Sequence, residues 1–335
     1  MQYRFEFRRY CLPFRLPLRT SQGPWSEREG VLVRLTDEGG RAGYGEAAPI
    51  PWYGTESVDE VERVCRGLGE HVTVDRLSAV PSHLGCLRNA LAAALAPSSG
   101  HRDPPAPLGV AALLPAGRAA LSAIPPRAEA GFRIFKWKVG IETVADELSL
   151  LDDVCAALPG GAQLRLDANG AWDRRETERW LDRCADRPVE HVEQPVPADA
   201  DGVTDLMLGL AGDYPTPIAL DESIAGEGDL ERWLGVGWPG VYVVKPSLLA
   251  NVAGALDSLR EANAPVVFSS ALETALGARL ALRAAFAWTG ERRAVGFGVW
   301  PLFAEERFDG LVTAPFIRWE DIERIDPEAV WNALS

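Results

Sequence analysis

The stretch that decides the fold is residues 132–169, FRIFKWKVGIETVADELSLLDDVCAALPGGAQLRLDAN. It begins and ends with short apolar runs, residues 132–139 and 163–169, and a helical pattern over residues 143–157 separates them. This order is typical of a βαβ unit, in which a helix joins two parallel strands. The stretch therefore predicts part of a parallel sheet.

The same alternation continues along most of the chain. Eight apolar runs recur about 24–31 residues apart, with helical patterns between them. Such a repeat predicts a (β/α)8-type, TIM-like barrel of the α/β class. A doubly wound open sheet fits less well, because no Gly-rich phosphate loop accompanies the repeat. The expected strands are residues 108–114, 132–139, 163–169, 189–194, 217–222, 241–245, 265–270 and 294–297.

The barrel is expected to carry a smaller N-terminal domain. Residues 1–98 predict an α+β capping domain, with a hairpin at Asp37-Glu-Gly-Gly40 and helices near residues 57–69 and 82–95. Residues 99–107 are rich in Pro, Ser and Gly and predict a linker. The barrel then spans residues 108–307, and we expect residues 308–335 to pack back on the capping domain.

Composition limits the possible functions. The 335 residues are 47% apolar and carry a net charge of −14, which argues against nucleic acid or an anionic membrane as partner. Five scattered cysteines without a CxxC pair favour reduced thiols, and no apolar run is long enough to span a membrane. We therefore expect a soluble, cytoplasmic protein. The sequence does not predict its oligomeric state. An anionic small molecule would need local positive charge in order to bind.

Lysine is almost absent from the chain. Only Lys136, Lys138 and Lys245 occur beside 31 arginines, and each lies in an apolar run. Compositional bias explains the depletion but not these positions. Arg stays protonated at ordinary pH, whereas the pKa of a Lys can be tuned until it loses its proton. The three positions therefore predict amines that transfer protons or form covalent bonds.

The polar residues at the predicted strand ends form a second pattern. In a TIM-type barrel the active site lies at the C-terminal ends of the strands. Carboxylates end three successive strands there and would repel one another without a cation, and oxygen ligands of this kind suit Mg²⁺. Alternatively, each carboxylate only caps the helix that follows it. The residues expected at this end are Lys136, Lys138, Arg165, Asp167, Asn169, Glu193, Asp221, Glu222 and Lys245.

A divalent ion between lysines suits the removal of a proton α to a carboxylate. The ion stabilises the dianionic enolate, and a neutral amine takes the proton. The pKa of such a lysine must fall from about 10.4 to about 7–8. A second lysine two residues away and a nearby cation can both lower it.

Five motifs make the sequence similar to a known family. Lys136-Trp-Lys138, Leu166-Asp-Ala-Asn-Gly170, Val192-Glu-Gln-Pro195, Leu220-Asp-Glu-Ser223 and Val243-Val-Lys-Pro246 resemble the muconate lactonizing subgroup of the enolase superfamily. The resemblance implies Mg²⁺, with Mn²⁺ able to substitute, held by Asp167, Glu193 and Asp221. It also implies that Lys138 and Lys245 act on opposite faces of the substrate, that Lys136 is an auxiliary amine, and that Asn169 and Glu222 support the ligands.

Within this subgroup the chain resembles the o-succinylbenzoate synthase family, through residues 12–25, 43–49, 268–273 and 302–303. This resemblance implies a carbon–oxygen lyase of menaquinone or phylloquinone biosynthesis. Such an enzyme performs a syn-dehydration of 2-succinyl-6-hydroxy-2,4-cyclohexadiene-1-carboxylate. Lys138 would take the α-proton and return it to the leaving hydroxyl, while Lys245 stays protonated and stabilises the enolate.

Three other functions compete with dehydration. An N-acylamino acid racemase or dipeptide epimerase would use both lysines as acid and base, although a dipeptide calls for an acidic partner that the sequence does not reveal. A Schiff-base aldolase would use Lys245 covalently without a metal. A non-catalytic binding relative conflicts with the intact set of lysines and carboxylates.

Several other residues allow two interpretations. Arg165 either pairs with a neighbouring carboxylate, which we expect, or contacts the substrate. His191 is expected to be a hydrogen-bonded core residue and not a metal ligand. Ser269 and Ser270, with the backbone of two nearby glycines, are candidates for holding a substrate carboxylate. Residues 20–25 and 50–54 form either a lid or ordinary surface turns.

Overall fold

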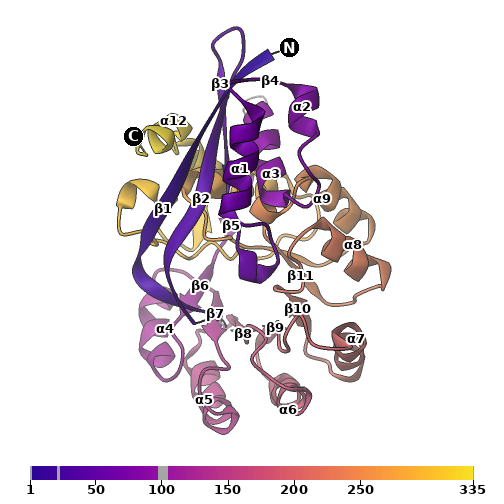
Figure 1. The fold of residues 1–335 in the computed structure, drawn as a ribbon. Helices are drawn as coiled ribbons and strands as arrows, with labels where there is room; N and C mark the ends of the chain where they lie inside the picture. Colours follow the sequence, from indigo (N-terminus) through magenta and orange to yellow (C-terminus); the bar gives the residue numbers. More distant parts are fainter. Residues whose placement is uncertain (1, 21–22, 97–104, 335) are drawn as a thin grey trace.

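The computed structural model describes residues 2–20, 23–96 and 105–334. An N-terminal unit, indigo to purple in Figure 1, lies against one end of a barrel whose helices surround its strands. The predicted α/β barrel with an N-terminal α+β domain is confirmed. Of the predicted linker, residues 99–104 lie outside the described residues.

The N-terminal unit is an antiparallel sheet covered by helices. Its strand order is β3-β2-β1-β4, and the predicted hairpin is present because Oδ1 of Asp37 accepts hydrogen bonds from the backbone N–H groups of Gly39 and Arg41, each at 2.9 Å. The elements are β1 (Gln2–Thr20), β2 (Gly23–Thr36), β3 (Ala42–Ala47), η1 (Pro51–Tyr53), α1 (Val58–Leu68), β4 (His71–Thr73), α2 (Val74–Ser78) and α3 (Gly85–Leu95).

Helix α3 packs directly on strand β3. A Cβ atom at Gly43 or Gly45 would lie 1.9 Å from the carbonyl oxygen of Ala94 or Ala90, respectively. Only glycine permits this approach. Strand β3 is thereby held close to α3, and its last residues lead into η1 over the barrel.

The barrel alternates parallel strands with helices. Its seven-stranded sheet has the order β12-β11-β10-β9-β8-β7-β6, so each strand pairs with the next along the chain. The elements are β6 (Ala111–Leu114), α4 (Ala119–Glu129), β7 (Ile134–Lys138), α5 (Val144–Ala157), β8 (Gln163–Asp167), α6 (Arg174–Cys184), β9 (Val189–Glu193), α7 (Val203–Asp213), β10 (Ile218–Leu220), α8 (Glu227–Gly235), β11 (Val241–Val244), η2 (Pro246–Leu248), α9 (Val252–Glu261), β12 (Val266–Phe268) and α10 (Ala275–Ala287).

The eighth predicted strand, residues 294–297, is not a strand. It closes the barrel through two isolated bridges only, Val110↔Val295 and Ser269↔Gly296. The backbone N–H of Val295 donates to the carbonyl oxygen of Gly109 at 2.7 Å, and that of Gly296 donates to the carbonyl of Phe268 at 2.7 Å. The segment thus pairs once with each edge of the sheet and then leaves it, which is too little to form a ladder.

The first predicted barrel strand is also divided. Residues 111–114 form β6 in the barrel, whereas β5 (Leu108–Gly109) pairs with β13 (Phe316–Ile317) outside it. The tail continues through η3 (Glu306–Phe308), α11 (Trp319–Glu323) and α12 (Pro327–Asn332). Trp331 of α12 lies against the N-terminal sheet, since its ring is 4.4 Å from the Arg8 guanidinium and 4.9 Å from that of Arg34.

Each unit has an apolar core, and each contributes side chains to the other. Tyr10, Leu12 and Phe14 of β1 pack in the barrel cluster, whereas Leu248 and Ala271 of the barrel pack in the N-terminal cluster. A third, small cluster of Ala219, Val241, Val243 and Val267 comes from three adjacent barrel strands. The two units therefore share a buried interface over one end of the barrel.

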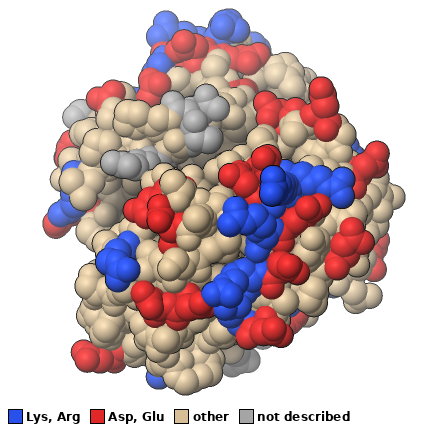
Figure 2. Space-filling view, turned by 90° about the horizontal axis from the view of Figure 1, so that it is seen from below, with Lys and Arg blue, Asp and Glu red and all other residues tan. Residues whose placement is uncertain are grey.

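The acidic surface and the free thiols agree with the negative net charge and the scattered cysteines of the sequence. On the face shown in Figure 2, acidic side chains are spread widely and basic ones gather mainly in one band. No helix in the described part of the chain is long and apolar enough to cross a membrane. All five cysteines are free thiols.

Candidate active site

The register of the parallel strands brings the predicted site residues together. Lys138 pairs with Asp167 on the next strand, and Asp167 pairs with Glu193 on the strand after that. Asp221 and Lys245 directly follow β10 and β11. All five residues therefore lie at the C-terminal ends of the strands, which we call the mouth of the barrel.

Strand β7 explains why both lysines face the mouth. Phe135 and Trp137 are fully buried, whereas Lys136 and Lys138 alternate with them and are partly exposed. Alternation along a strand therefore directs the aromatic rings outward to the helices and the amines into the barrel. The sequence Phe-Lys-Trp-Lys encodes this arrangement.

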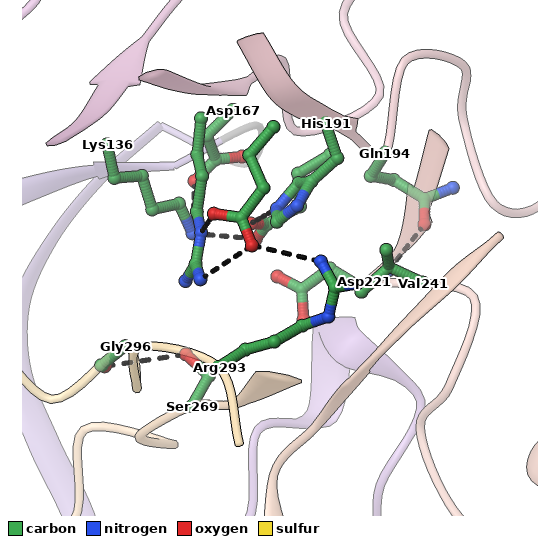
Figure 3. Close-up of polar contacts among 12 residues, drawn as sticks. Lys136, Asp167, His191, Gln194, Asp221, Val241, Ser269, Arg293 and Gly296 are labelled. Carbon is green, nitrogen blue, oxygen red and sulfur yellow. Dashed lines mark hydrogen bonds and ion pairs between the residues drawn. The ribbon is translucent and has the colours of Figure 1, made fainter. Parts of the chain in front are cut away.

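Lys136 is an ion-paired cation. Its Nζ lies 2.9 Å from Oδ2 of Asp167 and 2.6 Å from Oε1 of Glu193, as Figure 3 shows for the Asp167 side. Burial alone would lower the pKa of Lys136, but the two carboxylates outweigh it and raise that pKa above its usual value. Lys136 thus carries a fixed positive charge beside Lys138.

A second cluster joins the other side of the mouth to the N-terminal unit. Nζ of Lys245 forms an ion pair with Oδ1 of Asp221 and donates a hydrogen bond to the Tyr53 hydroxyl at 2.7 Å. Burial opposes ionisation of Asp221, yet the Lys245 ammonium lowers its pKa. Tyr53 was not singled out from the sequence, which left residues 50–54 as either a lid or ordinary surface turns.

Asn169 and Glu222 form a third contact. The side-chain amide of Asn169 donates to Oε1 of Glu222 at 2.9 Å. Burial, together with the negative charges of Asp221 and Asp167, raises the pKa of Glu222 to about 8. Any added positive charge nearby would stabilise the ionised form of this carboxyl group.

Gln194 ties the strand ends together and was also missed. Its Oε1 accepts hydrogen bonds from the backbone N–H groups of Asp221 and Ser223, at 3.0 and 3.1 Å. Its amide nitrogen donates to the Ser223 hydroxyl at 2.9 Å. The fully buried side chain therefore fixes the end of β10 against the end of β9. The sequence feature that could have identified Gln194 is its place in the Val-Glu-Gln-Pro motif.

The donor set fits a hard divalent cation. One oxygen each of Asp167 and Glu222 is buried without a hydrogen-bond partner among the described residues. Burial raises the pKa values of Asp167 and Glu193, and neighbouring carboxylates add to the effect. Within the described ranges no three His, Cys, Asp or Glu side chains are gathered as a metal cluster, and the Lys136 and Lys245 ammonium groups lie against the carboxylates of Asp167 and Asp221. A bound cation would take over that neutralisation.

Arg165 lies deeper in the barrel and pairs with Glu190. Its Nε donates to Oε2 of Glu190 at 2.7 Å, and Nη1 donates to the carbonyl oxygen of Ala294 at 2.7 Å. The pairing register shifts between Leu164 and Arg165, which is how Glu190, next to the inward-facing His191, also reaches this interior. Arg293 contacts the same carboxylate at 3.0 Å and is labelled in Figure 3.

His191 is buried, but not as expected. Neither ring nitrogen has a hydrogen-bond partner among the described residues, so the prediction of a hydrogen-bonded core histidine is wrong in that respect. Nε2 lies 3.9 Å from Oε2 of Glu193. Burial, and then the positive charge of Arg165, lower the pKa of His191 well below 6.5, which keeps the ring neutral.

Ser269 and Ser270 follow β12 at the mouth. The Ser269 hydroxyl is 3.5 Å from the carbonyl oxygen of Gly296, as Figure 3 shows. The Ser270 hydroxyl accepts a hydrogen bond from the backbone N–H of Leu272 at 2.9 Å. The two serines thus border the mouth between β12 and the closing segment.

Comparisons with known proteins agree with this fold and site. Residues 119–314 match the family described as "Enolase C-terminal domain-like", and residues 3–92 match "MenC, N-terminal domain". The barrel is therefore that of the enolase superfamily. The chain is 38% identical over 301 residues to an o-succinylbenzoate synthase of Thermosynechococcus vestitus, covering 88% of this chain and 92% of that relative. The chain belongs to the family of the o-succinylbenzoate synthases.

Further relatives and solved structures extend the likeness. An o-succinylbenzoate synthase of Thermobifida fusca is 32% identical over 81% of this chain and 75% of its own. The structure of o-succinylbenzoate synthase from Thermosynechococcus elongatus BP-1, complexed with Mg in the active site, superimposes with a TM-score of 0.81 at 36% identity, covering 93% and 96% of the two chains. The L-Ala-D/L-Glu epimerase from Bacillus subtilis has a TM-score of 0.79 at 20% identity over 93% and 94%, which shows the shared fold alone.

Proposed function

We propose that this protein is an o-succinylbenzoate synthase, a hydro-lyase that dehydrates 2-succinyl-6-hydroxy-2,4-cyclohexadiene-1-carboxylate in menaquinone or phylloquinone biosynthesis. The 38% identity to an o-succinylbenzoate synthase favours dehydration, and one observation of the structure supports the roles proposed for the lysines. Counting from β6, the barrel has eight segments, and Lys138 stands on the second and Lys245 on the sixth. In a closed barrel these segments face each other, with the carboxylates of the third, fourth and fifth segments between them.

The chemistry assigned to the lysines follows from this placement. Neutral Lys138 takes the proton from the ring carbon that bears the carboxylate, and the bonding electrons move into that carboxylate to give an enolate. When they return, the bond to the neighbouring hydroxyl breaks, and the protonated Lys138 delivers its proton to the leaving oxygen. Water and an aromatic ring result, so one amine completes both transfers on one face.

Other side chains are proposed to hold charge. Lys245, ion-paired with Asp221, faces the enolate as a cation, and Lys136 holds a second positive charge between Asp167 and Glu193. Asp167, Glu193 and Asp221 would hold Mg²⁺, supported by Asn169 and Glu222, and the ion when bound stabilises negative charge on the substrate carboxylate. Ser269 and Ser270 would bind a substrate carboxylate, and Arg165, paired with Glu190, would support the barrel beneath. We also propose a cytoplasmic location, which the five free thiols support.

A racemase is the second candidate. The facing lysines would equally serve a two-base exchange of an α-proton in an N-acylamino acid. NMR of the protein in D₂O with Mg²⁺ separates the two functions, because it reports formation of the aromatic product and incorporation of deuterium together. We expect rapid dehydration, abolished by EDTA and restored by Mg²⁺ or Mn²⁺. Full turnover at zero metal content would overturn the metal site, and exchange without dehydration would favour the racemase.

A further inference from the structure

Arg28 is a buried cation at the junction of the two units. It lies in β2, is 1% exposed, and uses all five of its N–H donors. Every acceptor is a main-chain carbonyl oxygen: Nε donates to Leu272 at 3.1 Å, Nη1 to Glu29 at 2.8 Å and to Pro49 at 2.7 Å, and Nη2 to Ala48 and to Ala271 at 3.3 Å. No ion pair of Arg28 is among these contacts.

Four of these five carbonyls, those of Ala48, Pro49, Ala271 and Leu272, belong to the two loops that border the mouth, and the fifth, that of Glu29, lies in β2 itself. Ala48 and Pro49 lead into η1, where Tyr53 contacts Asp221 and Lys245. The Arg28 guanidinium is also 5.3 Å from the ring of Trp25, which in turn packs edge-on against Trp52 of η1 at 4.5 Å. On this side Arg28 thus fixes the segment that carries Tyr53.

On the barrel side Arg28 holds the loop after the two serines. Leu272 has a φ of 59°, a conformation that a branched residue adopts only when its surroundings require it. The Ser270 hydroxyl accepts from the Leu272 N–H, Oε2 of Glu273 accepts from the Ala271 N–H at 2.6 Å, and Arg28 binds both carbonyls of these residues. The strained turn therefore depends on Arg28 for its carbonyl partners.

The surrounding interface is polar and fully buried. Glu46 of β3 accepts hydrogen bonds from the backbone N–H groups of Thr274 at 2.9 Å and Gly277 at 2.8 Å, at the start of α10. The Tyr10 hydroxyl donates to the same carboxylate at 2.6 Å. Such contacts have strict geometry, so the two units meet in one register and cannot slide over each other.

We propose that Arg28 is a positioning residue, which sets the Tyr53 loop and the Ser269–Leu272 loop at a fixed separation and thereby shapes the space that receives the substrate. The inference rests on the proposed dehydration. None of the Arg28 contacts given above involves Lys138. Arg28 therefore governs substrate binding and not proton transfer. Only a planar group with five donors can bind all five carbonyls, so lysine is not a substitute.

The test compares Arg28→Lys with Arg34→Lys, the same change on the same strand. Arg34 is partly buried and pairs with Glu6 at 2.6 Å, near Trp331 and away from the mouth. In Arg28→Lys we expect KM to rise at least about tenfold while kcat stays within about threefold and its pH profile is unchanged. Arg34→Lys should leave KM unchanged. Millimolar guanidinium, but not sodium chloride, should lower the raised KM of Arg28→Ala.

Hydrogen exchange supplies a readout that needs no substrate. In Arg28→Lys, backbone exchange should increase in residues 48–54 and 269–274 together, and not in α1. A folded Arg28→Lys protein with wild-type KM, or with faster exchange in neither segment, overturns the inference. If Arg28→Lys does not fold, Glu273→Met loosens the same turn from the barrel side, and an unchanged KM there has the same consequence. If the wild-type protein shows no turnover, the proposed function is refuted. The hydrogen-exchange result then tests the positioning role of Arg28 by itself.

Discussion

The Tyr53 hydroxyl donates a hydrogen bond to Oδ1 of Asp221 at 2.6 Å and also lies 2.5 Å from the carbonyl oxygen of that residue. Tyr53 belongs to the N-terminal unit and Asp221 ends barrel strand β10, so this contact closes one unit over the other. Burial, with the charges of Asp221 and Glu222, raises the pKa of Tyr53 well above 10. The phenol therefore remains a donor throughout the ordinary pH range.

Replacing Tyr53 by Phe should change the affinity for the metal. The variant keeps the ring but removes one of two donors to Oδ1 of Asp221, the other being Lys245. Because a cation then competes with fewer partners, we expect Mg²⁺ to bind about three- to tenfold more tightly, a gain of up to about 1.4 kcal/mol. The metal-free protein should lose about 1–3 kcal/mol of unfolding free energy. Calorimetry with Mg²⁺ and urea unfolding measure the two effects.

Tyr10→Phe is the matched control for that change. Its hydroxyl also donates to a buried carboxylate, but that carboxylate belongs to Glu46, which is not one of the proposed metal ligands. We expect a similar loss of stability and an unchanged Mg²⁺ affinity. If Tyr53→Phe instead bound Mg²⁺ more weakly than wild type, the hydroxyl would be orienting Asp221 for the ion and not competing with it.

Glu273 should make stability depend on pH. Burial, with the charge of Glu46 adding to it, raises the pKa of Glu273 to about 7. A carboxyl whose pKa is raised on folding stabilises the protein below its unfolded pKa, near 4.5, and loses that contribution as the pH rises through 7. The loss amounts to about 3 kcal/mol in this group alone. Unfolding free energies of wild type and Glu273→Gln between pH 4.5 and 8 should therefore diverge, with the variant showing the flatter profile.

A wild-type profile equally flat would mean that Glu273 ionises normally. The Arg28 side chain lowers the pKa of the Glu273 carboxyl, so a double variant that combines Glu273→Gln with Arg28→Lys offers a further check. Loss of the five carbonyl contacts of Arg28 should lower the unfolding free energy of this variant at every pH. The dependence of its unfolding free energy on pH should stay as flat as that of Glu273→Gln.

The periodic parts of the fold follow directly from the sequence. In Phe135-Lys-Trp-Lys138, alternation alone tells which side chains face the helices and which face the barrel interior. The C-terminal ends of parallel strands lie at one end of a barrel, so the sequence alone predicts that Asp167, Glu193 and Asp221 lie near one another. Seven of the eight predicted strands hold for this reason.

Contacts between distant loops did not follow from the sequence. Tyr53 reaches Asp221 across 168 residues, and Arg28 reaches Leu272 across 244. No local pattern encodes such pairs, since they depend on how the two units dock. Residues 294–297 failed as a strand for a related reason: an apolar run does not reveal that only one residue pairs with each edge.

Arg165→Met should mainly cost stability. Arg165 pairs with buried Glu190 and with the Ala294 carbonyl, so its loss removes one of two cations from that carboxylate and frees the closing segment. We expect a loss of about 3 kcal/mol in unfolding free energy, because Arg293 still pairs with Glu190. Urea unfolding measures it, and kcat per folded molecule should be nearly unchanged. An unaltered unfolding curve together with a large fall in kcat would assign Arg165 to the substrate instead.

Lys138 and Lys245 should fail differently when replaced. Arg at position 138 keeps the charge but cannot deprotonate the substrate, so dehydration should fall by at least about 10⁴-fold. Arg at position 245 keeps a cation opposite the base and beside Asp221, so measurable turnover should remain if the larger guanidinium fits. Lys245→Ala removes that cation and should be far worse. Initial rates under saturating Mg²⁺ give the comparison.

The contrast between the two Arg variants decides between one base and two. Single-base syn-elimination requires only the face of Lys138 for both proton transfers, so only that face must lose its proton. Near-wild-type dehydration by Lys138→Arg with an inactive Lys245→Arg would reverse the two roles. If both variants are equally inactive, and the wild type exchanges the α-proton of an N-succinylamino acid from both faces, then each amine must alternate as acid and base. That outcome would support the racemase, because only a two-base reaction needs a titrating lysine on both the second and the sixth barrel segments.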